Sequence, residues 1–468
     1  MENTIKQESP DLKLRTKNIL WISFGFFAIL MMWQIYNFYI PQFLGHLLEN
    51  NRGQANEEQF TWLIGLLMGV DNLVALLVIP LVGILSDKTK SKMGKRMPYI
   101  IAGSVATVVV FPFIPVLFIL NSLWGVIALM LVVLVTMNIV RGPAVSLMPD
   151  VTPKPLRPKA NSIVNLIGYI GAILGGGLTI IVTGRHVNTQ SDMLYFPFIV
   201  TSIVIVICIL LLYLKVKENK LAEEVKDDME IGEKFAETQA SQVSDRQLTK
   251  ADKFNLWLLL AGIFLWFFAF NAMETFWSTY GNEVFGTHVI ENGIPQYYAN
   301  GEPVMAGGPL IGMSPVVLAL VSLASFIPAA MLTKKIGRKL SVITGIIIIV
   351  AALIPMLFIN SMSLIVVALF GIVGIGWAII NVNSFPMLVE YSSKSTVGKF
   401  TGYYYGASQL AQGITPFVAG AVVSWGWGYK ALFPYVIIFF IFAFIVMMIF
   451  QSKRKNTAGQ QITVYDGD

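Results

Sequence analysis

The chain has 468 residues, of which 55% are hydrophobic and only 13% charged, and its formal net charge at pH 7 is +6. A soluble domain carries about twice this fraction of charged residues, so the composition excludes an ordinary soluble protein. One cysteine, Cys208, excludes an internal disulfide, and three histidines with this cysteine offer no zinc or haem site. We therefore expect neither a cofactor nor a metal.

Long apolar segments follow one another along the whole chain. We predict twelve membrane-spanning helices, at residues 18–45, 60–86, 97–120, 124–149, 160–183, 193–215, 254–282, 311–333, 340–360, 363–389, 398–424 and 430–452. At about 1.5 Å per residue each can cross a hydrocarbon core of about 30 Å. Strands of a β-barrel would instead alternate over about ten residues. The predicted fold class is an all-α polytopic membrane protein.

Lysine and arginine are distributed unequally between the two sides of the predicted membrane. All but four of the 33 lie on one side. Arg52, Arg185 and Lys430 lie on the other side, and Arg141 lies within a span. The bias predicts that both termini are cytoplasmic in a multi-pass protein of the cell membrane. It also accounts for the positive net charge, so we expect no nucleic-acid partner.

A charged stretch divides the spans into two groups of six. We predict a cytoplasmic N-terminus at 1–17, a six-helix bundle at 18–215, a partly helical cytoplasmic linker at 216–253, a second six-helix bundle at 254–452 and a cytoplasmic tail at 453–468. Gly94-Lys95-Arg96 after the second span has a counterpart in Gly337-Arg338-Lys339 after the eighth, and the fourth and tenth spans both end in an acid. These traces indicate a duplicated bundle with a binding site between its halves.

Three ionisable residues lie deep in the apolar spans. Arg141 is the only charged residue between Trp124 and Pro149, Asp71 lies in the second span, and Glu274 lies in the seventh. A charge at such a depth costs about 3 kcal/mol or more unless it faces protein or water. Buried carboxylates prefer the neutral form, so we interpret Glu274 or Asp71 as a proton carrier and Arg141 as its partner. A fixed structural ion pair, or an acid that faces an outer vestibule, is the alternative.

The segment after the second span reads Gly83-Ile-Leu-Ser-Asp-Lys-Thr-Lys-Ser-Lys-Met-Gly-Lys-Arg-Met-Pro98. It resembles the signature loop of the major facilitator superfamily, in particular that of the glycoside–pentoside–hexuronide cation symporters and the sucrose-type carriers. The segment Asp150-Val-Thr-Pro-Lys-Pro-Leu-Arg157 resembles the acid-then-arginine element after helix four of that superfamily. An acid at a helix end beside a basic loop can form ion pairs in one conformation and lose them in another. The resemblance thus implies conformational gating by Gly83, Asp87, Lys88, Gly94, Lys95, Arg96, Asp150 and Arg157.

The resemblance to sucrose-type carriers covers nearly all twelve spans. It includes Trp33-Gln-Ile-Tyr-Asn37 in the first span, Arg141-Gly-Pro143 in the fourth and Gly281-Asn-Glu-Val-Phe-Gly286 at the end of the seventh. It implies two six-helix halves and a sugar carrier driven by a cation gradient. Melibiose-type members have two aspartates in helix two, where this chain has Ala75 and Ile79. That sodium site is therefore not carried over, and we expect a proton as the coupling ion.

Recognition of a sugar needs aromatic faces for its C–H surfaces and amide or carboxylate groups for its hydroxyls. The stripe of Asn271, Glu274 and Trp277 is the candidate that we favour. The full set of substrate-binding candidates lies in six spans: Trp33, Gln34, Tyr36, Asn37, Asn138, Asn165, Tyr169, Asn271, Trp277, Asn381, Asn383, Gln409 and Gln412. Hydrogen bonds between helices are the alternative role for each amide, and interfacial anchoring is the alternative for aromatic residues near a span end.

The sequence thus predicts a secondary active transporter that imports a disaccharide or related glycoside of the maltose or sucrose type with protons, by alternating access. We expect a monomer in the lipid bilayer. An exporter of drugs or metabolites and a sodium-coupled glycoside symporter stay open as alternatives. An enzyme is disfavoured, since no nucleophile pair, metal cluster or Walker loop is visible. The outer loop at 282–310 is either a partial lid or a simple connection.

Overall fold

The computed structural model describes residues 12–52, 57–183, 192–241, 249–288, 290–291, 294–295, 305–306, 308–392 and 397–451. The predicted tail at 453–468 lies outside the described residues, as do most of the predicted N-terminal segment and part of the predicted outer lid.

Long helices make up almost all of the described chain. The first group comprises α1 (Thr16–Arg52), α2 (Glu57–Lys88), α3 (Met97–Val110) with α4 (Phe113–Ile119), α5 (Leu123–Asp150), α6 (Arg157–Thr183) and α7 (Phe196–Lys215). The second group comprises α10 (Lys250–Phe285), α11 (Pro309–Ile336), α12 (Arg338–Leu353), α13 (Leu364–Val389), α14 (Val397–Val422) and α15 (Leu432–Ile449). Short helical turns occur at η1 (Lys154–Leu156), η2 (Asp192–Tyr195), η3 (Ile354–Leu357), η4 (Val423–Trp427) and η5 (Tyr429–Ala431).

Eleven segments in the described part of the chain are long and apolar enough to cross a membrane. The helix predicted as the eleventh span, α14, is 26 residues long and packs within the bundle against α2 and α10, but it does not reach that apolarity. Its sequence explains this, because it carries Lys399, Gln409 and Gln412 together with three consecutive tyrosines. The all-α membrane fold that the sequence predicts is confirmed, and among the described long helices of the two groups only α14 falls short of that apolarity.

Two of the predicted spans are interrupted by proline. The span predicted at 97–120 divides into α3 and α4 around Phe111-Pro112, and the span predicted at 340–360 ends as the turn η3, which contains Pro355. A proline has no backbone N–H and its ring clashes with the preceding turn, which breaks the hydrogen-bond ladder of a helix.

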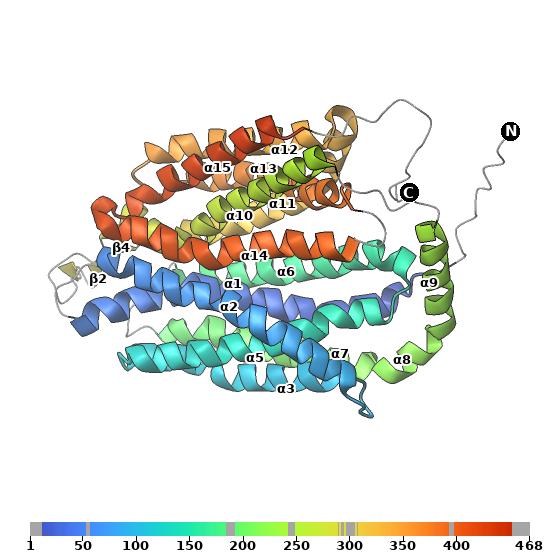
Figure 1. Ribbon diagram of the computed structural model, residues 1–468. Coiled ribbons are helices and arrows are strands. Elements are labelled where there is room, and N and C mark those ends of the chain that lie inside the picture. Colours follow the sequence, from blue (N-terminus) through green and yellow to red (C-terminus); the bar gives the residue numbers. More distant parts are fainter. Residues whose placement is uncertain are drawn as a thin grey trace.

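The two ends of the bundle differ, as Figure 1 shows. At one end lie the loop between α2 and α3 and the linker helices α8 (Glu218–Glu224) and α9 (Lys226–Ser241); we call this the linker end. At the other end, two short antiparallel ribbons follow α10, formed by β1 (Thr287–His288) with β4 (Met305–Ala306) and by β2 (Ile290–Glu291) with β3 (Ile294–Pro295). We call this the ribbon end.

The two groups of helices meet in a two-fold pattern. The second long helix of the first group, α2, packs against the fifth of the second group, α14, and correspondingly α11 packs against α6. Within the groups, α1 packs on α6 as α10 packs on α14, and α2 packs on α5 as α11 packs on α13. The loop corners agree with this pattern, because Arg96 at the start of α3 pairs with Asp150 at the end of α5, while Arg338 at the start of α12 pairs with Glu390 after α13. This is the arrangement expected of a duplicated bundle.

Candidate functional site

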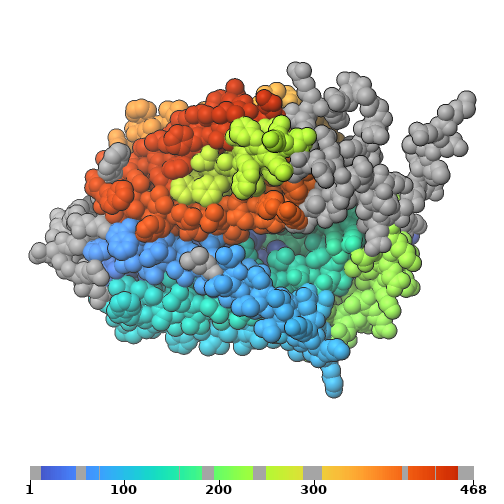
Figure 2. All heavy atoms as spheres, viewed as in Figure 1, coloured from blue at the N-terminus to red at the C-terminus, as the bar shows by residue number. Residues whose placement is uncertain are grey.

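The helices α2 and α14 touch at the ribbon end and separate toward the linker end (Figure 1). At the ribbon end they approach so closely that a Cβ atom on Gly65 would overlap the backbone of Pro416, and one on Gly69 would lie 2.5 Å from the carbonyl oxygen of Gly413. At the linker end, Gly83 of α2 and two glycines of α14 have open space where a Cβ would stand. Figure 2 shows the surface hollowed between these helices at the linker end, with α6 visible between them.

Polar contacts close the ribbon end between the two groups. The side-chain amide of Asn282 on α10 donates to the Gln42 side chain on α1 over 2.9 Å. The backbone N–H of Trp62 on α2 donates to the hydroxyl of Ser424, just beyond α14, also over 2.9 Å. The sequence did not single out Gln42 or Asn282 as site residues, because a cross-bundle amide pair leaves no local signal. The conformation is therefore closed at the ribbon end and open at the linker end.

A polar cluster from three helices surrounds Asp71 in the first group. Asn138 of α5 donates from its side-chain nitrogen to the Asp71 carboxylate over 3.2 Å and to the Leu134 carbonyl over 2.9 Å. Arg141, one turn further along α5, acts electrostatically on Asp71, as Asp71 does on Tyr36 of α1. No ion pair within 4.0 Å joins Arg141 to Asp71 among the described residues. The structure thus brings together four predicted site residues near the middle of their helices.

Glu274 lies opposite, on α10 of the second group. Its side chain is exposed, whereas Ala272, Met273, Thr275 and Phe276 beside it are buried. Across the interface between the groups, Glu274 interacts electrostatically with Tyr169 of α6. An exposed acid on a largely buried helix, facing a residue of the other group, indicates a hydrated space between the groups rather than contact with lipid.

Aromatic side chains of the second group form a stacked platform beside this acid. The rings of Phe270 on α10 and Trp377 on α13 stack with centroids 3.7 Å apart and planes 4° apart. Phe267 meets the same indole edge-on at 5.3 Å and meets Tyr404 of α14 edge-on at 6.3 Å. Tyr169 approaches Phe326 of α11 at 6.3 Å across the interface. The platform therefore lies where α10, α13 and α14 meet.

The remaining predicted substrate residues differ in whether other protein atoms occupy their polar atoms. Some have their polar atoms occupied by the protein: the Trp277 indole N–H donates to the Ile311 carbonyl over 2.8 Å, and Asn383 accepts from Thr333 over 2.9 Å and donates to the Ile379 carbonyl over 2.8 Å. The side chains of Asn381 and Gln412 likewise donate to carbonyls of their own helices, those of Trp377 and Ser408.

Other predicted substrate residues have polar atoms that no protein atom in the described part of the chain occupies. Among the described residues, the buried hydroxyl of Tyr36 and the buried side-chain oxygens of Asn138 and Asn271 accept no hydrogen bond. Asn165 is exposed one turn from Tyr169 on the same face of α6. Half-buried side chains complete the predicted set: Trp33, which meets Tyr36 edge-on at 5.3 Å, Gln34, which lies against Gly175 of α6, Asn37 and Gln409.

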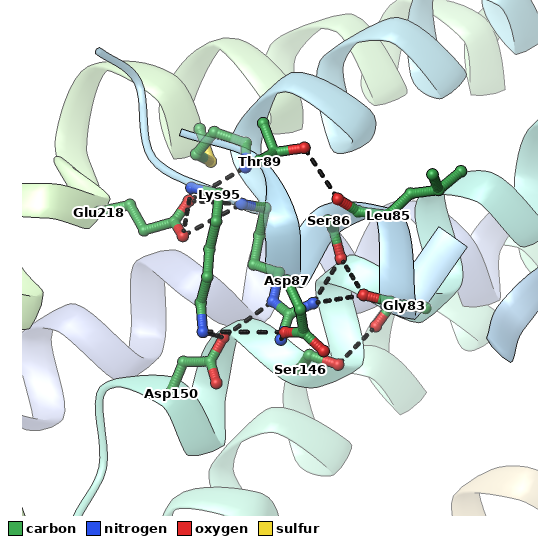
Figure 3. Close-up of polar contacts among 12 residues, drawn as sticks. Gly83, Leu85, Ser86, Asp87, Thr89, Lys95, Ser146, Asp150 and Glu218 are labelled. Carbon is green, nitrogen blue, oxygen red and sulfur yellow. Dashed lines mark hydrogen bonds and ion pairs between the residues drawn. The ribbon is translucent and has the colours of Figure 1, made fainter. Parts of the chain in front are cut away.

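Four predicted gating residues lie together at the linker end, namely Gly83, Asp87, Lys95 and Asp150 (Figure 3), and a fifth, Arg96, contacts three of them. The Arg96 guanidinium donates to Asp87 over 2.5 Å, to Asp150 over 2.8 Å and to the hydroxyl of Ser86. Lys95 adds an ion pair of 3.1 Å to Asp150. These contacts join the three helices α2, α3 and α5 at one point. The carbonyl of Gly83 also accepts a hydrogen bond from the Arg96 guanidinium over 3.4 Å.

Two predicted gating residues lie at the margin of this cluster. Lys88 is exposed at the end of α2. Arg157 donates to the carbonyls of Thr152 and Pro149 over 3.1 and 3.0 Å and so closes the turn after α5. Partial burial lowers the pKa of Arg157, an effect that the negative charges of Asp150 and Glu233 oppose. Its role here is to fix the turn that presents Asp150.

Comparison with known proteins identifies the fold. The family model of the Major Facilitator Superfamily matches residues 4–176, 142–308 and 301–462, which together cover nearly the whole chain. The chain belongs to the Major Facilitator Superfamily. Membership supports a secondary transporter that moves a small molecule across a lipid membrane, rather than an enzyme. No curated protein matches the chain significantly.

Solved structures share this superfamily fold at low sequence identity. The inward-open xylose transporter XylE from E. coli aligns with a TM-score of 0.64 and 12% identity over 94% of this chain and 97% of that one. The POT family transporter PepTSo aligns with a TM-score of 0.63 and 11% identity over 94% and 98%. The human organic anion transporter MFSD10 aligns with a TM-score of 0.56 and 15% identity over 93% and 100%.

Proposed function

We propose that this transporter imports a disaccharide or related glycoside together with protons, by alternating access. The observation that carries the proposal is the pair of carboxylates in mid-helix positions, Asp71 in one half and Glu274 in the other, beside the space between the halves. Because a charged carboxylate is costly at this depth, each has a reason to bind a proton when it is not paired or hydrated.

Proton binding at these acids would couple to substrate movement through their neighbours. Neutral Asp71 would no longer attract Arg141 electrostatically, so the arginine charge would need another partner inside the halves. Neutral Glu274 would lower the desolvation cost of closing the linker end over it. Both effects favour reorientation of the protonated, loaded carrier over that of the ionised one.

The polar atoms left free support a hydroxyl-rich substrate. Tyr36, Asn138, Asn165 and Asn271 offer donors and acceptors from both halves, and buried polar groups normally have partners. The aromatic platform around Trp377 supplies the apolar face that a sugar ring requires. Trp277 and Asn383 have their polar atoms engaged by the protein, so we assign them to packing and leave them out of the proposed sugar site.

The distribution of basic residues orients the proposal. Because nearly all lysines and arginines lie on the side of the linker, we place the linker end in the cytoplasm, with both termini. The described conformation would then open inward and be sealed outward. The cluster of Asp87, Arg96 and Asp150 would lie at the cytoplasmic face, where its ion pairs can make one conformation more stable than the other.

Uptake into proteoliposomes tests the proposal. Radiolabelled maltose and sucrose are offered to purified protein under an inward proton gradient, an inward sodium gradient or no gradient, with protein-free liposomes as the control. Accumulation of either sugar with protons alone is expected. Accumulation with sodium alone would overturn the proton assignment, while absence of uptake under all gradients would overturn the disaccharide assignment and favour an exporter or another substrate.

A further inference from the structure

The linker contributes a buried carboxylate to the start of α3. Glu218, at the first position of α8, is only 4% exposed. Its two carboxylate oxygens accept from the backbone N–H groups of Lys95, Arg96 and Met97 at distances of 2.9 to 3.1 Å. Figure 3 shows Glu218 beside Lys95, on the opposite side of the loop from Asp150. One side chain thus satisfies three consecutive backbone donors at the start of a helix more than a hundred residues away.

Helix α3 has no cap of its own. The first N–H groups of a helix lack partners within it and are normally satisfied by a nearby side chain. Here the residue at the N-cap position is Arg96, which makes no side-chain cap bond. An anion at this position also interacts favourably with the helix dipole, and hydrogen bonds to a carboxylate are stronger than neutral ones. Glu218 therefore replaces the missing local cap.

The adjacent loop is shaped to receive this carboxylate. Gly94 has a φ of +113°, in the region that favours glycine. A Cβ atom there would also lie 2.5 Å from the Cβ of Glu218. Asn219 reinforces the contact, because its side-chain amide donates to the carbonyls of Ser91 and Lys92 over 2.9 and 3.2 Å. The glycine of the signature loop is explained by the approach of the linker.

The backbone held by Glu218 carries the arginine at the centre of the gating cluster. The N–H of Arg96 donates to Glu218 while its guanidinium reaches the end of α2 through Asp87 and Ser86. This end of α2 is the part that stands away from α14 in the described conformation. The position of the Arg96 backbone therefore determines whether its guanidinium can hold the linker end of α2 away from α14.

The linker is attached to the first half at further points. Arg15 pairs with Glu224 over 2.6 Å, Lys154 pairs with Glu233 over 2.6 Å, and Gly232 of α9 lies against Pro153. The equivalent helix of the second half, α12, has Gly337 at its N-cap position, where the described residues provide no side-chain cap. The acid supplied by the linker therefore distinguishes the two otherwise matching corners.

We propose that Glu218 is a positioning residue of the transport cycle, which holds the start of α3 from the linker so that Arg96 keeps the linker end of α2 apart from α14. The proposal rests on the alternating access proposed above. It assigns a mechanical role to a linker residue that touches neither substrate nor coupling ion.

Amide hydrogen exchange tests the contact itself, without any assumption about the substrate. In Glu218→Gln the amides of Lys95, Arg96 and Met97 should exchange about tenfold faster, because an N-cap contributes on this scale. Glu223→Gln is the matched control, since Glu223 is exposed on the same helix. Unchanged exchange in Glu218→Gln and also in Glu218→Ala would overturn the proposal at its first step.

Alkylation of an introduced cysteine tests the conformational role, again without a substrate. In a Cys208→Ala background, Gly406→Cys places a thiol on α14 where the structure has open space. Adding Glu218→Gln should slow its alkylation at least threefold, because α2 would be less firmly held in the open position. Faster amide exchange with unchanged alkylation would show a helix cap without a conformational role, and would overturn the proposal.

Transport measurements complete the test once a substrate is in hand. Glu218→Gln should lower kcat severalfold with KM nearly unchanged, and Glu218→Asp should recover part of the loss. Combined with Asp87→Asn, the effect on kcat should be much less than the product of the two separate effects, because both act through Arg96. Independent, multiplicative effects would overturn the proposal. If no sugar is transported, the exchange and alkylation results still decide the role of Glu218 separately.

Discussion

The close approach of α2 and α14 predicts a strong effect of a single added methyl group. In Gly65→Ala the new Cβ would overlap the carbonyl group of Pro416 and approach the nitrogen of Phe417 to 3.0 Å. All three are backbone atoms, so no side chain can turn aside. Overpacking of this kind costs about 1–3 kcal/mol. Because the clash exists only while the ribbon end is closed, it should shift the conformational equilibrium about five- to 150-fold toward the opposite state.

The same helix supplies the matched control. Gly83→Ala also adds a methyl group to α2, but nothing lies within 4 Å of its Cβ position. Replacing glycine by alanine within a helix favours the helix by about 1 kcal/mol, so neither variant should lose helicity. The alkylation rate of Gly406→Cys reports the population open at the linker end; it should fall in Gly65→Ala and stay near the parent rate in Gly83→Ala. Equal rates in the two variants would refute the inference that backbone contact seals the ribbon end.

Three further predictions concern single side chains. Glu274→Gln should abolish proton-driven accumulation but leave counterflow exchange measurable, since a neutral side chain mimics the protonated carrier; unchanged accumulation in proteoliposomes would remove Glu274 from the coupling mechanism. Asp87→Asn should lower kcat with little change in KM, because it loosens the hold of Arg96 on α2; normal turnover with poor affinity would contradict this. Burial, aided by the charge of Asp252, raises the pKa of Tyr391 to about 12. Since an unfolded tyrosine titrates near 10, the stabilising effect of its neutral form is present below about pH 10 and is lost as the pH rises toward 12. The midpoint temperature of thermal unfolding in detergent should therefore fall less between these two pH values in Tyr391→Phe than in the parent protein. Identical pH profiles of the two proteins would exclude Tyr391 as the cause of the fall.

The membrane-spanning helices could be predicted well from sequence because insertion depends on the local apolarity and length of each segment. Where the prediction is incomplete, the reason is equally local: Pro112 and Pro355 interrupt helices that hydropathy alone reads as continuous. The corner of Asp87, Arg96 and Asp150 could also be predicted from the sequence, since the motif brings an acid and basic residues to one end of neighbouring helices.

The contacts that join distant parts of the chain could not be predicted. Glu218 is one of many acids in a charged linker, and its partners are backbone N–H groups that carry no sequence signal. The bond between Gln42 and Asn282 depends on how the two halves meet. The sequence predicts Trp277 as a substrate residue on one stripe with Asn271 and Glu274, but only tertiary structure shows that its indole N–H donates to the carbonyl of Ile311. The proposed roles of Asp71 and Glu274 in coupling stay predictions.

The modest apolarity of α14 has a consequence for how the protein is made. A segment that carries two glutamines, a lysine and a run of tyrosines gains little free energy when it moves by itself from the insertion machinery into lipid. Its polar side chains become tolerable only when α2 and α10 shield them from hydrocarbon. Stable integration of α14 must therefore follow the arrival of both earlier helices. Because α2 belongs to the first half, the second half completes its membrane insertion only against a first half that is already in place.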